Sequence, residues 1–217
     1  HGISLRSPEE DYLALLPAAG CFFFYMAVPF SNQFRDLARL GNLPEDRRKR
    51  LLDFYHLLIQ KHLFALGRED RIFLSKNAAF ASWVPYLADR YPTASFIFQV
   101  RDPRGALSSQ ISSLQNAFLS FGIQTEEAST LRDFENIFFE NLSTIEAFLN
   151  THPKTRAVLI DQSDLKLASS ELLASAIDRL NLSVCIEVKP THDGPEAEHR
   201  SNHQHHSRMQ FQPRYHD

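Results

Sequence analysis

Apolar residues recur at helical spacing along several stretches of the chain. From Glu45 to Leu66 they fall every three or four residues, which predicts an amphipathic helix of several turns. The same spacing predicts four further helices, over Ala79–Arg90, Pro103 to about Leu119, Leu131–Asn150 and Ser169–Leu180. A short first helix is expected to run from Ser7 to about Leu16, because Ser7-Pro8 followed by acidic residues is a helix-start signature.

Three shorter apolar runs have the form of buried strands. They are Arg71–Lys76, Ser95–Arg101 and Arg156–Asp161. Because strands and helices alternate along the chain, we expect a three-layer α/β/α fold with a mainly parallel sheet. This domain is expected to cover residues 1–190, followed by a polar, histidine-rich tail over residues 191–217.

Composition narrows the classes of partner. Apolar residues make up 43% of the chain, which is enough for a substantial core. The formal charge of −3 gives no general attraction to nucleic acid, so we expect no nucleic-acid partner, and any anion site must be a local group of basic residues. A basic run at Arg47–Arg50 has two interpretations, a surface for an acidic acceptor or a solvated helix face.

The cysteines and the longest apolar run indicate the cellular compartment to expect. The two cysteines, Cys21 and Cys185, fit buried thiols better than a disulfide framework, which favours a reducing compartment, and we expect a cytoplasmic protein. The longest apolar stretch, Ala18–Phe30, is interrupted and too short for a transmembrane segment.

Candidate chemistry gathers where the predicted strands end. Lys76, Arg101 and Asp161 stand at carboxyl ends of strands, where open parallel sheets bind ligands. Ser109 follows Arg101 by about two helical turns, so a guanidinium and a hydroxyl can converge on one phosphate. The alternative is that Arg101 forms an ordinary ion pair with Asp102 or another neighbour and that Ser109 only belongs to a polar helix face.

Several spaced motifs in this region resemble those of sulfotransferases that use 3′-phosphoadenosine 5′-phosphosulfate (PAPS). The motifs are Leu74–Asn77, Tyr91–Ile97, Arg101–Pro103 and Ser109. Weaker similarities extend over nearly the whole chain, at Ser7–Asp11, Val158–Leu165 and His203–Phe211. The resemblance implies a P-loop-type α/β sulfotransferase fold in which Arg101 and Ser109 hold the 3′-phosphate of PAPS. From its strand end, Lys76 is expected to bind near the donor or the acceptor, and the alternative is a strand-end lysine exposed to water.

The resemblance also implies the reaction. The family transfers a sulfuryl group to a hydroxyl or amine of a small-molecule or carbohydrate-type acceptor, without a metal. A general base must then take the acceptor proton. His1, Glu9, Glu10 and Asp11 are candidates, with His1 and Glu10 preferred, although the acidic residues are equally explained as partners of the helix dipole. A metal at His203, His205 and His206 is the less favoured interpretation of the tail.

One element of the family pattern is missing from the sequence. No strand and glycine-rich loop for the 5′-phosphosulfate precede the region of similarity. We therefore expect either an N-terminally incomplete chain or a degenerate relative, lacking the first strand and the phosphate loop. Unpaired strand edges would follow, and with them self-association.

Three functions remain open at this point. The first is PAPS-dependent sulfotransfer. The second is a non-catalytic relative or fragment that binds a nucleotide or a protein partner. A P-loop kinase-like enzyme ranks last, because no acidic metal-holding pair stands out.

Overall fold

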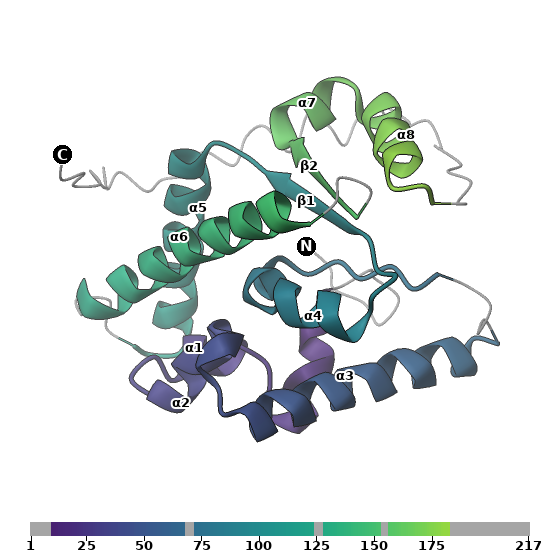
Figure 1. The fold of residues 1–217 in the computed structure, drawn as a ribbon. Helices are drawn as coiled ribbons and strands as arrows, with labels where there is room; N and C mark the ends of the chain where they lie inside the picture. Colours follow the sequence, from purple (N-terminus) through teal and green to yellow (C-terminus); the bar gives the residue numbers. More distant parts are fainter. Residues whose placement is uncertain (1–9, 68–71, 124–127, 153–155, 183–217) are drawn as a thin grey trace.

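The computed structural model describes residues 10–67, 72–123, 128–152 and 156–182, and Figure 1 shows that helices dominate this part of the chain. The first third contains short helical turns followed by one long helix. Its elements are η1 (Asp11–Ala18), α1 (Phe23–Ala27), α2 (Asn32–Arg35), η2 (Asp36–Ala38), η3 (Leu40–Asn42) and α3 (Glu45–Ala65). The predicted first helix is confirmed as the 3₁₀ helix η1, whereas its expected cap at Ser7 lies outside the described residues.

The remaining described residues alternate between helices and two strands. The elements are η4 (Ala78–Trp83), α4 (Val84–Arg90), β1 (Phe96–Val100), α5 (Pro103–Ser120), α6 (Ala128–Thr151), β2 (Ala157–Asp161), α7 (Gln162–Leu167) and α8 (Ser169–Arg179). The five longer predicted helices are confirmed. The helix expected over Ala79–Arg90 begins as the 3₁₀ turn η4 and continues as α4.

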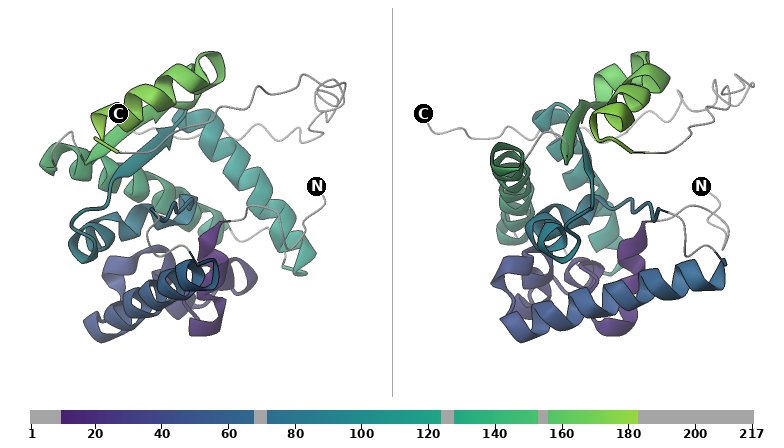
Figure 2. Two further views of the ribbon diagram at one scale, coloured as in Figure 1. Left: turned by 90° about the vertical axis from the view of Figure 1, so that its right-hand side faces the viewer. Right: turned by 45° about the vertical axis from the view of Figure 1, so that its right-hand side comes forward.

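The strands β1 and β2 pair in parallel, from Phe96 opposite Ala157 to Val100 opposite Asp161. Helices lie on both sides of this pair (Figure 2). On one face, Phe98 packs with Phe148 of α6 and with side chains of α4. On the other face, side chains of β2 pack against α8. The expectation of an α/β fold with parallel strands is therefore confirmed, whereas the full P-loop-type layering stays a prediction.

The strand predicted over Arg71–Lys76 is wrong for the residues that can be judged. Residues 72–77 have no regular secondary structure, and Arg71 lies outside the described part. A strand exists only where a neighbour completes its hydrogen bonds, and the described sheet contains β1 and β2 alone. The side chains of Ile72 and Leu74 are 61% and 86% exposed, so the apolar run is not a core strand.

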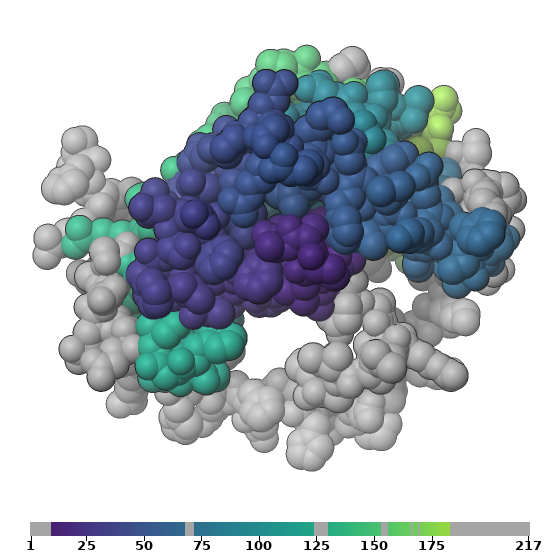
Figure 3. Space-filling view, turned by 90° about the horizontal axis from the view of Figure 1, so that it is seen from below, coloured from purple at the N-terminus to yellow at the C-terminus, as the bar shows by residue number. Residues whose placement is uncertain are grey.

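The N-terminal helices form their own core below the strands. The rings of Phe80 and Trp83 stack with centroids 4.6 Å apart, and Leu51 and Tyr55 on the inner face of α3 are buried in the same cluster. Seen from below, the purple to blue surface of residues before about 67 covers much of this side (Figure 3). The long helix α3 thus closes one side of the molecule.

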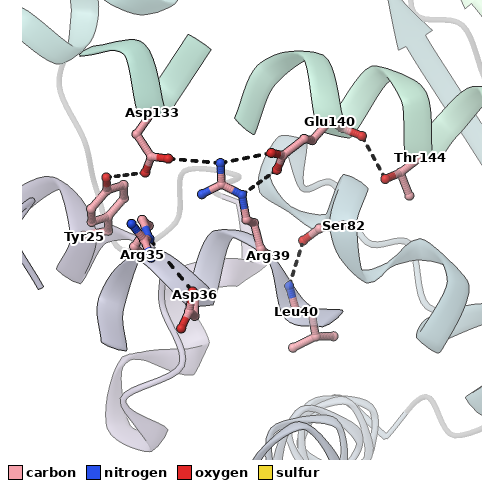
Figure 4. Close-up of polar contacts among 9 residues, drawn as sticks. All are labelled: Tyr25, Arg35, Asp36, Arg39, Leu40, Ser82, Asp133, Glu140 and Thr144. Atoms are coloured by element: carbon pink, nitrogen blue, oxygen red, sulfur yellow. Dashed lines mark hydrogen bonds and ion pairs between the residues drawn. The ribbon is translucent and has the colours of Figure 1, made fainter. Parts of the chain in front are cut away.

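A polar network joins this helical part to α6 (Figure 4). Arg39 donates from Nη2 to Asp133 at 3.0 Å and from Nε to Glu140 at 2.5 Å. Tyr25 donates its hydroxyl to the other oxygen of Asp133 at 2.5 Å. Because the Arg39 side chain is only 15% exposed, its charge depends on these carboxylates for compensation. The network fixes the short N-terminal helices against α6.

Candidate functional site

The carboxyl ends of β1 and β2 lie side by side. Val100 is the last residue of β1 and is paired with Asp161, the last residue of β2. Arg101 therefore leaves the sheet at the same end at which α7 begins. This carboxyl end of the strands is where parallel sheets place ligand-binding residues.

The turn from β1 into α5 has the predicted capping geometry. Asp102 has non-helical backbone angles, and its Oδ2 accepts a hydrogen bond from the Gly105 amide at 2.8 Å. Pro103 occupies the first helical turn, where its missing N–H costs nothing. The capping role of Asp102 is confirmed, and its carboxylate is directed at the helix.

The Arg101 side chain lies along the first turns of α5. Its Nη2 lies 3.4 Å from the carbonyl oxygen of Ala106, a long hydrogen bond, and the residue is exposed. Ser109 is also exposed and comes three residues after Ala106, which places it on the same side of the helix. Among the described residues no salt bridge joins Arg101 to Asp102. The exposed position of Ser109 fits both a phosphate-binding role and a polar helix face.

Asp161 has a local role at the neighbouring strand end. Its carboxylate accepts from the Ser163 hydroxyl at 2.5 Å and from the Ser163 amide at 2.7 Å, capping α7. The hydroxyl contact first, and then the amide contact, lower the pKa of Asp161 below its ordinary value. The carboxylate is thus held ionised against the helix start.

The other predicted site residues meet in a second place. Lys76 Nζ lies 2.8 Å from Glu10 Oε1. Lys76 is 77% exposed, whereas the Glu10 side chain is 24% exposed. Since residues 72–77 are not a strand, Lys76 does not stand at a strand end as predicted, and it reaches Glu10 from an irregular segment.

Beside this ion pair, Asp11 forms a cluster that the sequence did not reveal. Its Oδ2 accepts from the Tyr55 hydroxyl at 2.5 Å and from the Ser75 hydroxyl at 2.7 Å. Burial, and then the hydrogen bond to Asp11, raise the pKa of Tyr55. Tyr55 stands among the apolar positions of α3, and the signal that could have found the cluster is that a buried tyrosine hydroxyl requires a partner.

The structure therefore contains two separate groups of candidate residues. Arg101 and Ser109 belong to the β1–α5 junction, whereas Glu10 and Lys76 meet beside η1. His1, the other preferred base, lies outside the described residues.

Metal and membrane features can be judged for the described residues only. Within these ranges no group of three or more His, Cys, Asp or Glu side chains could hold a metal ion, and the tail histidines lie outside them. Over the same residues, no helix is both long enough and apolar enough to span a bilayer.

Comparison with known proteins identifies the family. The model described as the sulfotransferase family matches residues 32–185 of the 217, a range that includes Lys76, Arg101 and Ser109. The chain belongs to this family, which supports a general sulfotransferase function. No curated protein and no solved structure matches the chain significantly.

Proposed function

We propose that this protein is a PAPS-dependent sulfotransferase that transfers the sulfuryl group to a hydroxyl or amine of a small-molecule or carbohydrate-type acceptor. Family membership supports the reaction class. The observation that carries the donor assignment is the position of the exposed Arg101 guanidinium over the first turns of α5, 3.4 Å from the Ala106 carbonyl oxygen and on the side of Ser109.

The 3′-phosphate of the donor suits this pair of side chains. A guanidinium offers two parallel N–H groups to phosphate oxygens, and a hydroxyl adds a neutral donor. The bond from Arg101 to Ala106 is long and lies at the surface, so exchanging it for a charge-assisted bond to phosphate is favourable. Asp102 Oδ2 accepts from the Gly105 amide, and among the described residues no salt bridge joins Asp102 to the arginine.

Glu10 is the proposed general base, and Lys76 beside it is the proposed donor-binding lysine. Sulfuryl transfer requires a base for the acceptor proton and a cation for the charge that develops on the leaving phosphate. Glu10 supplies a carboxylate and Lys76 an ammonium group, and their 2.8 Å contact holds the two together at the surface. His1 stays the other proposed base.

A non-catalytic relative that still binds the nucleotide is the second candidate. It is favoured by the same ion pair, since a lysine paired with Glu10 has part of its charge compensated before any donor arrives. Both candidates require the nucleotide site, so nucleotide binding is the first property to test.

Isothermal titration calorimetry with adenosine 3′,5′-bisphosphate tests the donor site. We expect Arg101→Ala to weaken binding about 10- to 100-fold, because a charged hydrogen bond contributes about 1.5–3 kcal/mol. Ser109→Ala is expected to weaken it about three- to tenfold. Arg179→Ala at the end of α8 and Ser120→Ala at the end of α5 are matched controls that should bind like wild type. Equal affinity of Arg101→Ala and wild type would refute the proposed site.

A further inference from the structure

The ion pair between Lys76 and Glu10 lies at the surface and cannot fix its own geometry. An exposed pair gains little free energy, because water competes for both charges and a long side chain has to be immobilised. The Lys76 side chain is 77% exposed, and its Nζ lies 2.8 Å from Glu10 Oε1. Contacts beside the pair must therefore hold the two segments together.

The segment around Lys76 is held on both sides, although it has no regular secondary structure. On one side, Ser75 donates its hydroxyl to Asp11 Oδ2 at 2.7 Å. On the other side, the Asn77 side chain accepts from the Ala79 amide at 2.9 Å and caps η4. The backbone of the lysine is therefore fixed by its two neighbours, whereas its side chain stays exposed.

Asp11 is itself anchored to the core. Its Oδ2 also accepts from the Tyr55 hydroxyl at 2.5 Å, and the oxygen of that hydroxyl lies 3.2 Å from Ser75 Oγ. The Tyr55 residue of α3 is only 4% exposed, and its ring contacts Phe80 of η4 edge to face, with centroids 5.2 Å apart. The helix η1 packs against α3 (Figure 1). Because hydrogen bonds to a carboxylate are strong, Asp11 joins η1, α3 and the segment of the lysine at one point.

Glu10 is directed at the lysine and not at its own helix. It precedes η1 with extended backbone angles, and within the described part of the chain its side chain makes no capping hydrogen bond to that helix. Glu10 directly precedes Asp11 in the sequence. Lys76 directly follows Ser75, so the hydrogen bond between Ser75 and Asp11 keeps the ammonium group within reach of the Glu10 carboxylate.

We propose that Asp11 is a positioning residue for the sulfuryl-transfer reaction and holds Lys76 against Glu10 through Ser75. Tyr55 connects this contact to the core. The general base and the donor-binding lysine then act from fixed positions, so less conformational freedom is lost when the donor and the acceptor bind. This inference rests on the proposed functions of Glu10 and Lys76.

Carbodiimide crosslinking of the full chain measures this pairing. The reagent joins a carboxylate and an amine that are in contact as an amide and leaves as a urea, and mass spectrometry of the digested protein quantifies each crosslinked peptide. The ion pair between Lys49 and Asp53 on α3, at 2.9 Å, is the internal reference. The measured quantity is the yield of the Glu10–Lys76 crosslink relative to the Lys49–Asp53 crosslink in the same sample.

Three substitutions weaken the proposed support in different ways. Ser75→Ala removes the hydroxyl at an exposed position, and we expect it to lower the crosslink ratio about three- to tenfold. Tyr55→Phe keeps the ring but releases Asp11, and it should lower the ratio by a similar factor. Asp11→Asn keeps an acceptor oxygen without the charge, so its ratio should lie between those of wild type and Ser75→Ala.

Two further variants are controls. Ser75→Thr restores a hydroxyl at the same position and should stay within about twofold of wild type. Tyr86→Phe removes a hydroxyl from a ring that contacts Arg48, near the start of α3, and should keep the wild-type ratio. Thermal denaturation identifies any variant that fails to fold, and the two variants of the exposed Ser75 decide the question if Tyr55→Phe is one of them.

A merely structural role of Asp11 would change the thermal stability or lower both crosslinks together, whereas a positioning role lowers the Glu10–Lys76 crosslink alone. The inference is overturned if this crosslink is absent from wild type, if Ser75→Ala keeps the wild-type ratio, or if Ser75→Thr loses as much as Ser75→Ala. Binding of adenosine 3′,5′-bisphosphate to the same samples separates the two proposals. An unchanged crosslink ratio with intact nucleotide binding refutes the positioning role alone, and a wild type that does not bind the nucleotide refutes the proposed function.

Discussion

Arg101 Nη2 lies 3.4 Å from the carbonyl oxygen of Ala106, so the guanidinium follows α5 toward Ser109 instead of pairing with the adjacent Asp102. Because of this position, the affinity for a phosphate should depend on whether residue 101 is an arginine or a lysine. An ammonium group cannot bind two phosphate oxygens with parallel N–H groups.

Arg101→Lys should therefore bind adenosine 3′,5′-bisphosphate with an affinity between those of wild type and Arg101→Ala. We expect a loss of about fivefold to twentyfold relative to wild type, since the charge remains but one charge-assisted bond is lost. Calorimetric titration of the three proteins at one salt concentration measures this order. A lysine variant equal to wild type would mean that only charge, and not the guanidinium geometry, is used.

Arg156 should be a major determinant of stability. Its guanidinium donates to the carbonyl oxygens of Tyr91 at 2.9 Å, Ala94 at 3.1 Å and Ala88 at 3.2 Å, where α4 ends and the chain turns toward β1. Arg156→Met keeps much of the volume but leaves these acceptors without the charged donor. We expect the free energy of unfolding to fall by about 2–3 kcal/mol.

Urea unfolding with an unchanged m-value measures the effect of Arg156→Met. Arg179→Met, at an exposed position near the end of α8, is the matched control and should change the stability by less than about 0.5 kcal/mol. Similar losses in the two variants would show that the contacts of Arg156 are not the cause.

Stability should also fall at high pH because of Tyr25. Burial, and then the hydrogen bond to Asp133, raise the pKa of this phenol. The folded state therefore retains the phenol proton more strongly than the unfolded chain does. The stabilisation is complete below the unfolded pKa of about 10 and is lost progressively as the pH rises above it.

Tyr25→Phe removes this titration, so its stability should decline less steeply between about pH 9 and about pH 11 than that of wild type. Urea unfolding across this range measures the slope. Tyr86→Phe, which removes a hydroxyl from a ring that contacts Arg48, is the control and should keep the wild-type slope. An unchanged slope in Tyr25→Phe would exclude Tyr25 as a source of the decline.

The exposed apolar surface beside the strands predicts self-association. Ile97 on β1 is 41% exposed, and Leu159 on β2 is 49% exposed. Each of the two described strands also has one unpaired edge, which favours pairing between chains. Analytical ultracentrifugation should find oligomers that increase with concentration, and Ile97→Lys should shift them toward monomer.

Leu167→Lys is the matched control for that experiment. Leu167 is 87% exposed but belongs to the helix α7 and not to a strand, so its substitution should leave association through the strands unchanged. A wild-type chain that stays monomeric at all concentrations would contradict the prediction.

The junction of β1 and α5 could be predicted because its signals are local. Asp102 and Gly105 lie within one turn, and a capping residue followed by proline predicts a helix start without knowledge of the rest of the fold. The long helices were predictable for the same reason, since a repeat of three or four residues is a property of the segment itself.

The cluster around Asp11 could not be predicted because its contacts are distant in sequence. Asp11 is 44 residues from Tyr55 and 64 residues from Ser75. The position of Tyr55 on the apolar side of α3 indicated core packing, and only the tertiary structure brings its hydroxyl to a carboxylate.

The strand predicted at Arg71–Lys76 was wrong for a related reason. Its apolar run satisfies the local pattern, but a strand also needs a neighbour, and the side chains of Ser75 and Lys76 bind η1 instead. The sequence pattern of this segment predicted its apolar character, but whether it forms a strand depends on pairing with a neighbouring strand.

The central claim is that Arg101 recognises the 3′-phosphate of the nucleotide. The most direct measurement compares adenosine 3′,5′-bisphosphate with adenosine 5′-phosphate, which lacks only that group, in wild type and in Arg101→Ala. We predict that the substitution weakens binding of the bisphosphate about 10- to 100-fold and leaves binding of the monophosphate unchanged. Equal losses for both nucleotides, or no loss for either, would contradict the claim.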